Sequence, residues 1–429
     1  MKILTVVQHL GSGGNERVAQ NFSLIYKLCG HEVAVLAIDH GGVREEILNQ
    51  NNIKLFLGAS EREEKIKAVQ QAIAWKPDLV HIHKAGVRDD SLIEILRDGI
   101  NDRVPFLEKQ SFSQVSSHNH LIDLNVHQTR WCFWKFKGMA TFKNIKPEPP
   151  SVIIPNPTEA SSFFRESKES CQTLKRELGI PEQSFVYGRV GQPFDGKWHS
   201  IIIKAFSDVI QQERDAFLLL VGSSDSIKSH VEKLPEFIRK RVFLVDYIYG
   251  DENLRIAYSA IDVFVHAAKQ GESFGMVLVE AMLCKTPVIT LATPYKDNSQ
   301  VEVVGHGVGG LVVYDPKEFS SAMLDLFDDR DYLTYLSTEA RKRALNNFSF
   351  EAVTNEVKLL LHQLEQSKTR SEFLSNVKNC SELVTDISGK EVYNLLSLNN
   401  GKIQNHIISR FLANPQSYPW ITKVMSKIK

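Results

Sequence analysis

The stretch DVFVHAAKQGESFGMVLVEAM, residues 262–282, contains the pattern that decides the fold. Its first four residues, 262–265, form a short run with the length of a buried strand. A run with the length of a helix starts near Met276, and a glycine-flanked loop lies between the two. A strand, a loop and a helix in this order predict one repeating unit of a parallel sheet that helices cover on both faces.

The same alternation extends from this stretch toward both ends of the chain. Further strand-length apolar runs are predicted at 3–8, 33–38, 53–57, 79–82, 104–107, 185–190, 217–221, 242–245, 288–291 and 311–313. Between the two series, prolines recur from Pro147 to Pro157 and predict a hinge, because proline interrupts both helices and strand ladders. We therefore predict an α/β protein with two doubly wound parallel-sheet domains and a ligand site in the crevice between them.

The composition excludes several classes of function. The 429 residues include 51 Lys plus Arg and 51 Asp plus Glu, so no global field attracts nucleic acid or an anionic membrane. Five scattered cysteines without a CxxC pair argue against a disulfide scaffold or a zinc ribbon and indicate a reducing compartment. Neither a signal-peptide pattern nor a run of 18 apolar residues occurs, and we expect a cytoplasmic protein.

Two glycine-rich loops follow strand-like segments and resemble phosphate-binding loops. The first, residues 11–16, ends in Glu16 where a dinucleotide-binding loop needs a glycine for close helix packing. The second, residues 191–198, mimics a P-loop but lacks the magnesium-binding hydroxyl after its lysine. This loop still brings Lys197 near Arg189 at the carboxyl end of a buried strand, so we predict two cations that point at a ligand.

The loop and helix of residues 271–282 hold two carboxylates, Glu272 and Glu280. If the helix starts near Met276, both carboxylates lie near its amino terminus. The free amides of residues 274–277 and the helix dipole would favour an anion there. Carboxylates in such apolar surroundings predict a corner that binds hydroxyl and phosphate groups.

These segments occur in an order that is typical of one enzyme family. The set includes GGNERV at 13–18, GHEV at 30–33, PDLVHIH at 77–83, IPNP at 154–157 and GRV at 188–190, in addition to residues 262–280. The sequence resembles the family 4 retaining glycosyltransferases over most of residues 1–365. Those enzymes have the GT-B fold, in which two Rossmann-like domains face each other.

The resemblance implies roles for the candidate residues. Arg189 and Lys197 would hold the diphosphate of a nucleotide-sugar donor, and Glu272 would hold the hydroxyls of its sugar, so these three are the candidate catalytic residues. The other candidate donor-binding residues are Gly13, Gly14, Phe274, Gly275, Met276, Val277, Glu280 and Tyr247. Among them, Glu280 would take the ribose hydroxyls, and the Gly13–Gly14 loop would close over the diphosphate from the opposite domain.

The resemblance also implies a division of labour along the chain. Residues 1–155 would form the acceptor-side domain and residues 156–365 the donor-binding domain. Residues 366–429 would form a tail, expected to be helical, that packs on the first domain or serves as an interaction segment.

The expected activity is that of a retaining glycosyltransferase. It would move a hexosyl group from a nucleoside-diphosphate sugar to a glycan or lipid-linked glycan, in the biosynthesis of a surface polysaccharide such as lipopolysaccharide. No cofactor and no metal are expected, and Asp329-Arg330-Asp331 is interpreted as a solvated turn. Two alternatives stay open: an inactive binding module, or a nucleotide-sugar epimerase of the same fold.

Some features depart from the family pattern. A histidine common after the fifth strand is missing at that register, and Glu108, Lys109, His118 and His120 are the nearby candidates to replace it. Residues 297–300 replace a glycine-rich approach to Glu302, a change expected to affect sugar preference more than reaction class.

Residues 130–146 combine five basic and five aromatic residues without an acid. Such a segment could rest on the anionic inner face of a membrane where a lipid-linked acceptor is displayed. The alternative interpretation is a surface helix whose aromatic side chains belong to the core.

Overall fold

The computed structural model describes residues 1–83, 90–111, 115–145, 150–397 and Trp420. The chain divides into two compact units, which are described separately. Unit 1 consists of Met1–Pro157 together with Phe350–Val392, and unit 2 contains Thr158–Ser349. Across the described residues, no helix is both long and apolar enough to cross a bilayer.

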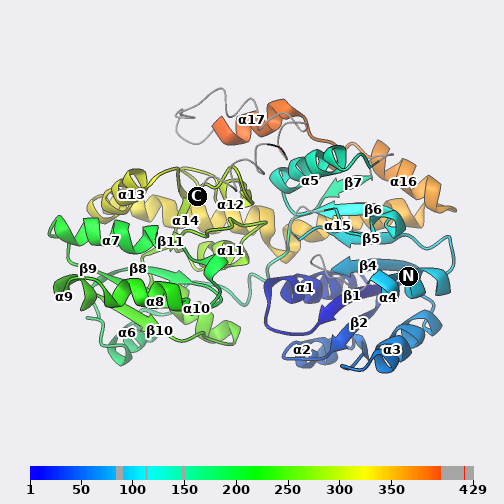
Figure 1. Ribbon diagram of the computed structural model, residues 1–429, viewed down its shortest axis with the longest axis horizontal. Coiled ribbons are helices and arrows are strands. Elements are labelled where there is room, and N and C mark those ends of the chain that lie inside the picture. Colours follow the sequence, from blue (N-terminus) through cyan, green and yellow to red (C-terminus); the bar gives the residue numbers. More distant parts are fainter. Residues whose placement is uncertain (84–89, 112–114, 146–149, 398–419, 421–429) are drawn as a thin grey trace. The chain divides into compact units, whose positions relative to one another are not determined.

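Unit 1 is built on a seven-stranded parallel sheet in the order β3-β2-β1-β4-β5-β6-β7 (Figure 1). Its strands are β1 (Lys2–His9), β2 (Glu32–His40), β3 (Lys54–Leu57), β4 (Leu79–His83), β5 (Phe106–Lys109), β6 (Leu124–His127) and β7 (Ser151–Ile153). Its helices are α1 (Gly14–Leu28), α2 (Glu45–Gln50), α3 (Arg62–Ala74), α4 (Asp90–Gly99), α5 (Arg130–Phe142), α15 (Phe350–Glu365) and α16 (Arg370–Asn379).

Unit 2 is built on a six-stranded parallel sheet in the order β10-β9-β8-β11-β12-β13. The strands are β8 (Phe185–Val190), β9 (Ala216–Val221), β10 (Val242–Val245), β11 (Val263–His266), β12 (Val288–Leu291) and β13 (Gly310–Val313). The helices are α6 (Lys168–Glu177), α7 (Ile201–Gln211), α8 (Asp225–Glu232), α9 (Glu236–Arg239), α10 (Asp251–Ala260), α11 (Met276–Leu283), α12 (Ser299–Val304), α13 (Pro316–Asp328) and α14 (Arg330–Phe348).

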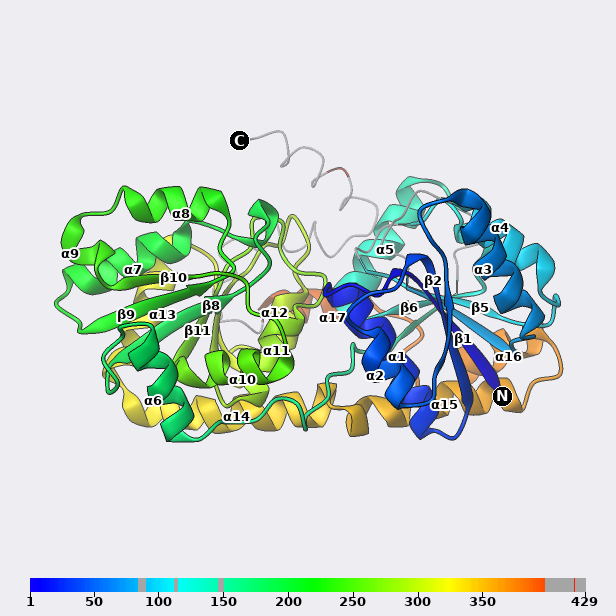
Figure 2. The same ribbon diagram turned by 90° about the horizontal axis from the view of Figure 1, so that it is seen from below.

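Helices cover both faces of the unit 2 sheet, and each face has its own core (Figure 2). One core joins the sheet to α7, α8, α9 and α13 through residues such as Phe206 and Phe319. The other joins it to α10, α11, α12 and the second half of α14 through residues such as Tyr258 and Met282. Apart from the partly exposed edge strand β10, the strands are therefore buried on both faces, which explains why they read as continuous apolar runs rather than as alternating ones.

The predicted class, two doubly wound parallel sheets, is confirmed, with two differences in unit 1. The segment 124–127, LNVH, is a central strand that its mixed composition did not indicate. Residues 151–153, which the sequence analysis assigned to the hinge, form the edge strand β7, paired with β6 through Val126 and Val152. The prolines after β7 end the sheet rather than replace it, and residues 146–149 lie outside the described residues.

The domain boundary at residue 365 differs from the structure. Helix α15 was predicted to end the second domain, but it belongs to unit 1, where it packs against α1. Residues 366–392 also belong to unit 1: α16 packs on α15, and the amide of Ile153 in β7 donates to the carbonyl oxygen of Val384 at 2.9 Å. The tail segments 398–419 and 421–429 lie outside the described residues.

Helix α5 carries the basic aromatic segment. Four of its aromatic side chains, Trp131, Phe133, Trp134 and Phe136, are buried, and only Phe142 is exposed among the aromatics of this helix. Lys137 forms an ion pair with Asp386 at 2.7 Å. The second interpretation, a helix whose aromatic side chains belong to the core, is therefore the one that the structure supports.

Three histidines of unit 1 make its stability depend on pH. His81, His83 and His127 are completely buried, and burial first and the charge of Lys109 further lower the pKa of each. Their ordinary pKa is about 6.5, so below that pH the unfolded chain binds protons that the folded chain does not. Burial raises the pKa of Asp123 and raises the pKa of Glu356 to about 7. Both shifts act in the opposite direction, but they involve two carboxyl groups against three histidines.

We predict that the free energy of unfolding rises between about pH 4.5 and 6.5, by at most about 1.4 kcal/mol per pH unit for each histidine. Urea unfolding across this range measures the slope. The variant His127→Phe should show a smaller slope than wild type, because one proton-binding group is gone from the unfolded chain. An unchanged slope would contradict the assignment of this histidine as neutral and buried.

Candidate active site

The strand order of unit 2 reverses between β8 and β11, which are neighbours in its sheet. The chain leaves β8 in one direction along the sheet and leaves β11 in the other. In open parallel sheets, ligands bind beyond the carboxyl ends of the strands at such a switch point. The segment after β8 contains Lys197, and the segment after β11 contains Glu272, so the sheet topology brings these two predicted residues together.

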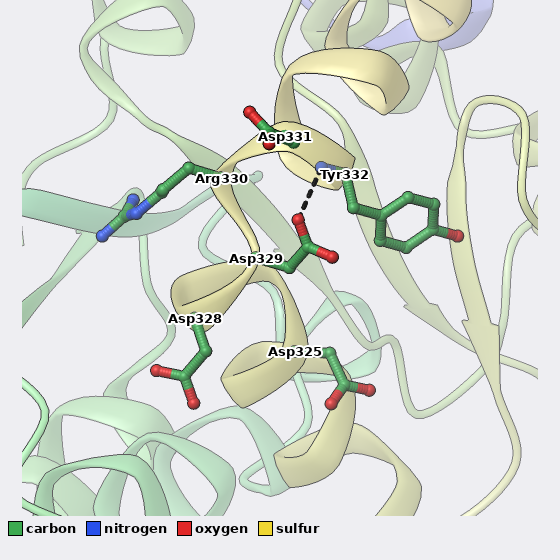
Figure 3. A pocket seen from close by; sticks show the side chains of 6 residues that line it. All are labelled: Asp325, Asp328, Asp329, Arg330, Asp331 and Tyr332. Carbon is green, nitrogen blue, oxygen red and sulfur yellow. Dashed lines mark hydrogen bonds between the residues drawn. The ribbon is translucent and has the colours of Figure 1, made fainter.

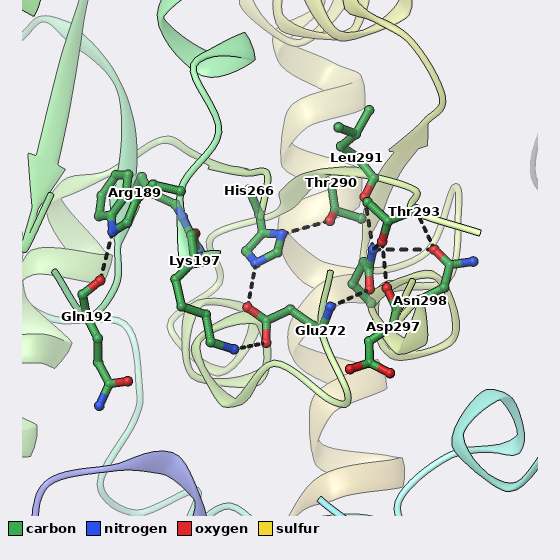
Figure 4. A network of polar contacts seen from close by, with 12 residues as sticks. Arg189, Gln192, Lys197, His266, Glu272, Thr290, Leu291, Thr293, Asp297 and Asn298 are labelled. Carbon is green, nitrogen blue, oxygen red and sulfur yellow. Dashed lines mark hydrogen bonds and ion pairs between the residues drawn. The ribbon is translucent and has the colours of Figure 1, made fainter. Parts of the chain in front are cut away.

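Glu272 is buried, and each of its carboxylate oxygens has a partner (Figure 4). The Nζ atom of Lys197 lies 2.6 Å from Oε2, and Nε2 of His266 lies 3.3 Å from Oε1. Burial alone would raise the pKa of Glu272. The charge of Lys197 and the hydrogen bond from His266 more than offset burial and hold the pKa well below its usual range. The carboxylate is therefore ionised near pH 7.

Arg189, the other predicted cation, is more deeply buried than its sequence position indicated, with 1% of its surface exposed. Its Nη2 donates to the backbone oxygen of Lys197 at 3.0 Å, and the rings of Trp198 and Phe264 flank the guanidinium. The Nε and Nη1 atoms have no hydrogen-bond partner among the described residues. Burial lowers the pKa of Arg189 to about 10, so the group stays charged.

The charges of Arg189, Lys197 and Glu272 do not cancel. Lys197 and Glu272 balance each other, and burial lowers the pKa of His266 to about 4, so this histidine is neutral near pH 7. Arg189 is then the uncompensated charge of the group. A buried cation with two free donors is costly unless an anion binds nearby.

The loop that carries Glu272 can form only with glycine at its two ends. Gly271 has φ +70°, and a Cβ atom there would lie 1.7 Å from the backbone oxygen of Asp297. Gly275 has φ +90° and is the residue before α11. The first turn of α11 therefore starts directly after the loop, and the amides of Met276 and Val277 lie at a helix terminus, where they have no intrahelical acceptor.

A glutamine that the sequence analysis did not single out holds this loop from behind. Gln300 accepts a hydrogen bond from the backbone amide of Glu272 at 3.2 Å. Its Nε2 donates to the carbonyl oxygen of Leu291 at 3.0 Å and to Oγ1 of Thr293 at 2.7 Å. The amide of Ser299 also donates to the carbonyl oxygen of Glu272 at 2.9 Å. The segment 297–300 thus fixes the backbone of Glu272.

The remaining predicted residues of unit 2 flank this centre. Glu280 is buried on α11 and accepts a hydrogen bond from the hydroxyl of Tyr258 at 2.8 Å. Phe274 is buried and packs edge-on against Phe348, so its side chain anchors the loop and only its backbone can serve a ligand. Tyr247 follows β10 and stacks edge-to-face on Tyr249.

Gly13 and Gly14 lie in unit 1, at the start of α1. A Cβ atom on Gly13 would meet the carboxylate of Glu16, whereas a Cβ atom on Gly14 would meet nothing within 4 Å. Arg44 holds the loop by donating from Nε to the carbonyl oxygen of Gly11 at 2.8 Å. The contact of this loop with a donor stays a prediction.

The candidates for the missing histidine are engaged within unit 1. Glu108 pairs with His118 at 2.9 Å, and both are buried. The Nζ atom of Lys109 donates to the carbonyl oxygen of Ile154 at 2.5 Å, and burial lowers the pKa of Lys109 to about 7. His120 is exposed. Glu108, Lys109 and His118 are therefore buried in unit 1 and paired with other groups of that unit.

The Asp-x-Asp stretch forms the exposed junction of α13 and α14 (Figure 3). Asp329 accepts a hydrogen bond from the amide of Tyr332 at 2.8 Å and thereby caps α14. This capping role explains the acidic turn. In the described part of the chain, no group of three or more His, Cys, Asp or Glu residues could hold a metal ion.

Comparisons with known proteins find similar sequences and structures. Residues 171–343 match the family model described as Glycosyl transferases group 1. The D-inositol 3-phosphate glycosyltransferase of Corynebacterium jeikeium is 26% identical over 230 residues, which cover 51% of this chain and 53% of that protein. The N-acetyl-alpha-D-glucosaminyl L-malate synthase of Bacillus anthracis is 23% identical over 298 residues, 67% of this chain and 75% of that protein.

A solved structure is similar to most of this chain. The crystal structure of Anabaena Alr3699/HepE in complex with UDP-glucose matches with a TM-score of 0.65 and 20% identity, covering 84% of this chain and 99% of that one. The predicted GT-B fold is confirmed by this likeness and by the two Rossmann-like sheets. The chain spans about half the length of the first curated relatives that it matches.

The two glycines Gly271 and Gly250 provide a matched test of the loop. Both have positive φ, but a Cβ atom on Gly250 meets nothing within 4 Å, whereas on Gly271 it would overlap the backbone of Asp297. We predict that Gly250→Ala lowers stability only by the strain of its backbone, about 1–2 kcal/mol. Gly271→Ala should cost clearly more, because the loop must move as well. Thermal unfolding compares them, and equal losses would contradict the close packing of this loop.

Proposed function

We propose that this chain, whose residues 171–343 match the family model of the group 1 glycosyltransferases, transfers a hexosyl group from a nucleoside-diphosphate sugar to a glycan or lipid-linked glycan acceptor, with retention of configuration. The observation that carries the proposal is the uncompensated charge of Arg189, whose Nε and Nη1 have no partner among the described residues. Its place at the switch point of the unit 2 sheet suits the diphosphate of a donor.

The charges of the site support the departure of a diphosphate. As the bond between the anomeric carbon and the phosphate oxygen breaks, negative charge grows on the leaving group. Arg189, Lys197 and the amides at the start of α11 are in place before the reaction, so they stabilise that charge without reorganising. Lys197 is the more accessible of the two cations, since its side chain is 27% exposed, and we assign it the direct contact with phosphate.

Glu272 is assigned to the donor sugar as a hydrogen-bond acceptor rather than as a base. Its pKa is held well below the usual range, and both of its oxygens already accept from His266 and Lys197. A carboxylate this acidic takes up a proton poorly. We therefore propose that the acceptor hydroxyl attacks the anomeric carbon from the side of the leaving group, and that its proton passes to the departing phosphate oxygen. This step uses no protein nucleophile and no metal.

The nucleoside of the donor and the acceptor are assigned to other parts of the chain. Glu280 and the segment around Tyr247 would hold the nucleoside, and unit 1 would bind the acceptor in the biosynthesis of a surface polysaccharide, for instance lipopolysaccharide. The named relatives support a polar acceptor, since one is a D-inositol 3-phosphate glycosyltransferase and another an N-acetyl-alpha-D-glucosaminyl L-malate synthase. A contact of residues 130–146 with a membrane would rest on exposed Phe142 and Lys143, because the other aromatic side chains of α5 are buried.

Turnover of UDP-glucose, the donor named for the similar structure, tests the proposal. We predict that wild type releases UDP in the presence of EDTA, slowly with water and faster with a glycan acceptor. Lys197→Ala should lower kcat by about 10²- to 10³-fold, as the loss of one donor to a developing oxyanion does. Lys204→Ala is the matched control, because Lys204 is exposed on α7 and should leave the rate unchanged.

Other outcomes select the alternatives. Binding of nucleoside diphosphates without turnover of UDP-, GDP- or ADP-sugars would identify an inactive binding module. Conversion of the donor into an isomeric nucleotide sugar, without transfer, would identify an epimerase. Equal rates for Lys197→Ala and Lys204→Ala would refute the assigned phosphate contact.

A further inference from the structure

His266 is the last residue of β11. It hydrogen-bonds Glu272, but the proposed mechanism gives it no contact with the donor. Its side chain is completely buried. Nε2 lies 3.3 Å from Oε1 of Glu272, and Nδ1 lies 3.0 Å from Oγ1 of Thr290 on β12. The ring, on β11, therefore forms one hydrogen bond to the neighbouring strand β12 and one to the loop that carries Glu272.

The direction of both hydrogen bonds follows from the charge of Glu272. An ionised carboxylate only accepts, so the proton on Nε2 of His266 must be donated to it. Near pH 7 the ring is neutral, because burial and next the charge of Arg189 lower its pKa to about 4. Nδ1 is then an acceptor and takes the hydroxyl proton of Thr290.

The hydrogen bond from His266 also fixes the direction of Oε2, the second carboxylate oxygen of Glu272. With Oε1 held by His266, the Oε2 atom is directed at Nζ of Lys197, 2.6 Å away. The backbone of Glu272 is fixed separately by Gln300, so His266 is free to set the rotation of the side chain alone. A carboxylate held at one oxygen by a neutral donor and at the other by a cation has one orientation rather than several.

We propose that His266, held by Thr290, is a positioning residue that fixes the carboxylate of Glu272 for donor binding and acts on the donor only through Glu272. The proposal rests on the proposed function, in which Glu272 contacts the donor sugar. It goes beyond that function because it assigns a task to a residue that does not touch the ligand.

A double-mutant cycle on the affinity for UDP-glucose, measured calorimetrically, tests the proposal. His266→Leu should weaken binding by about tenfold in the wild-type background, because Oε1 loses its donor and the carboxylate can rotate. In the Glu272→Ala background, the same substitution should change the affinity by less than about twofold. Losses that multiply independently would overturn the proposal, since His266 would then act on the donor or the fold by another route.

Conservative variants separate positioning from a structural role. His266→Gln retains an amide donor and should recover part of the lost affinity. Thr290→Val should weaken binding in the same direction but less, while Thr290→Ser should match wild type. His230→Gln is the control, because His230 is exposed on α8 and its Nδ1 bonds to the carbonyl oxygen of Ser226 in the same helix.

A spectroscopic readout keeps this test independent of turnover. In ¹⁵N-labelled protein, the imidazole of His266 should carry its proton on Nε2 and should not titrate between about pH 5.5 and 8. A proton on Nδ1, or a titration in this range, would overturn the positioning role. If wild type binds no UDP-glucose while the Nε2 tautomer is present, the proposed function fails and the hydrogen-bond geometry of His266 stands.

Discussion

A carboxylate buried beside a cation is the interaction on which the rest of this site depends. Glu272 is 4% exposed, and an ionised carboxyl group at that depth is stable only if its oxygens are paired. Lys197 comes from the segment after β8 and His266 from the end of β11, so the pairing requires that these strands be neighbours. The strand order of the sheet, with its reversal between β8 and β11, supplies that condition.

The two loops at the switch point are shaped to bring those partners together. Gly271 allows the backbone to pass against residue Asp297, and Gln300 holds the amide of Glu272 from the far side. The loop is thereby rigid before any ligand binds. Rigid polar groups are what electrostatic stabilisation of a leaving group requires, because their orientation then costs nothing during the reaction. The charges of Arg189, Lys197 and Glu272 do not cancel, and the positive charge that remains favours an anion near this loop.

The sequence predicted the parts of this site that follow from local pattern. Arg189, Lys197, Glu272 and Gly275 were found because a strand, a glycine and a charged residue recur there at short spacing. The roles of His266 and Gln300 were not predicted: the contact of His266 with Glu272 depends on how the loop after β11 folds back, and the partner of Gln300 lies 28 residues away in the sequence. A histidine at a strand end and a glutamine at the start of a helix carry no local signal of that kind.

For the fold as well, local sequence patterns predicted the elements, whereas contacts between distant segments could not be predicted. Continuous apolar runs identified most strands, whereas β6 contains Asn125 and His127 and was missed. Helix α15 was recognised as a helix, but the unit to which it belongs depends on its packing against α1, which no pattern within the helix reveals. The aromatic residues of α5 could have faced a lipid surface or the core, and burial of Trp131 and Phe136 decided the matter.

The most direct test of the central claim is the thermal midpoint of Arg189→Met with and without UDP. Replacing an uncompensated buried charge by an apolar side chain of similar length is often neutral or stabilising. If Arg189 is present to bind the diphosphate, the variant should melt at the same temperature as wild type or higher without UDP, and UDP should stabilise it far less. A variant that melts lower than wild type and keeps the full stabilisation by UDP would contradict the claim.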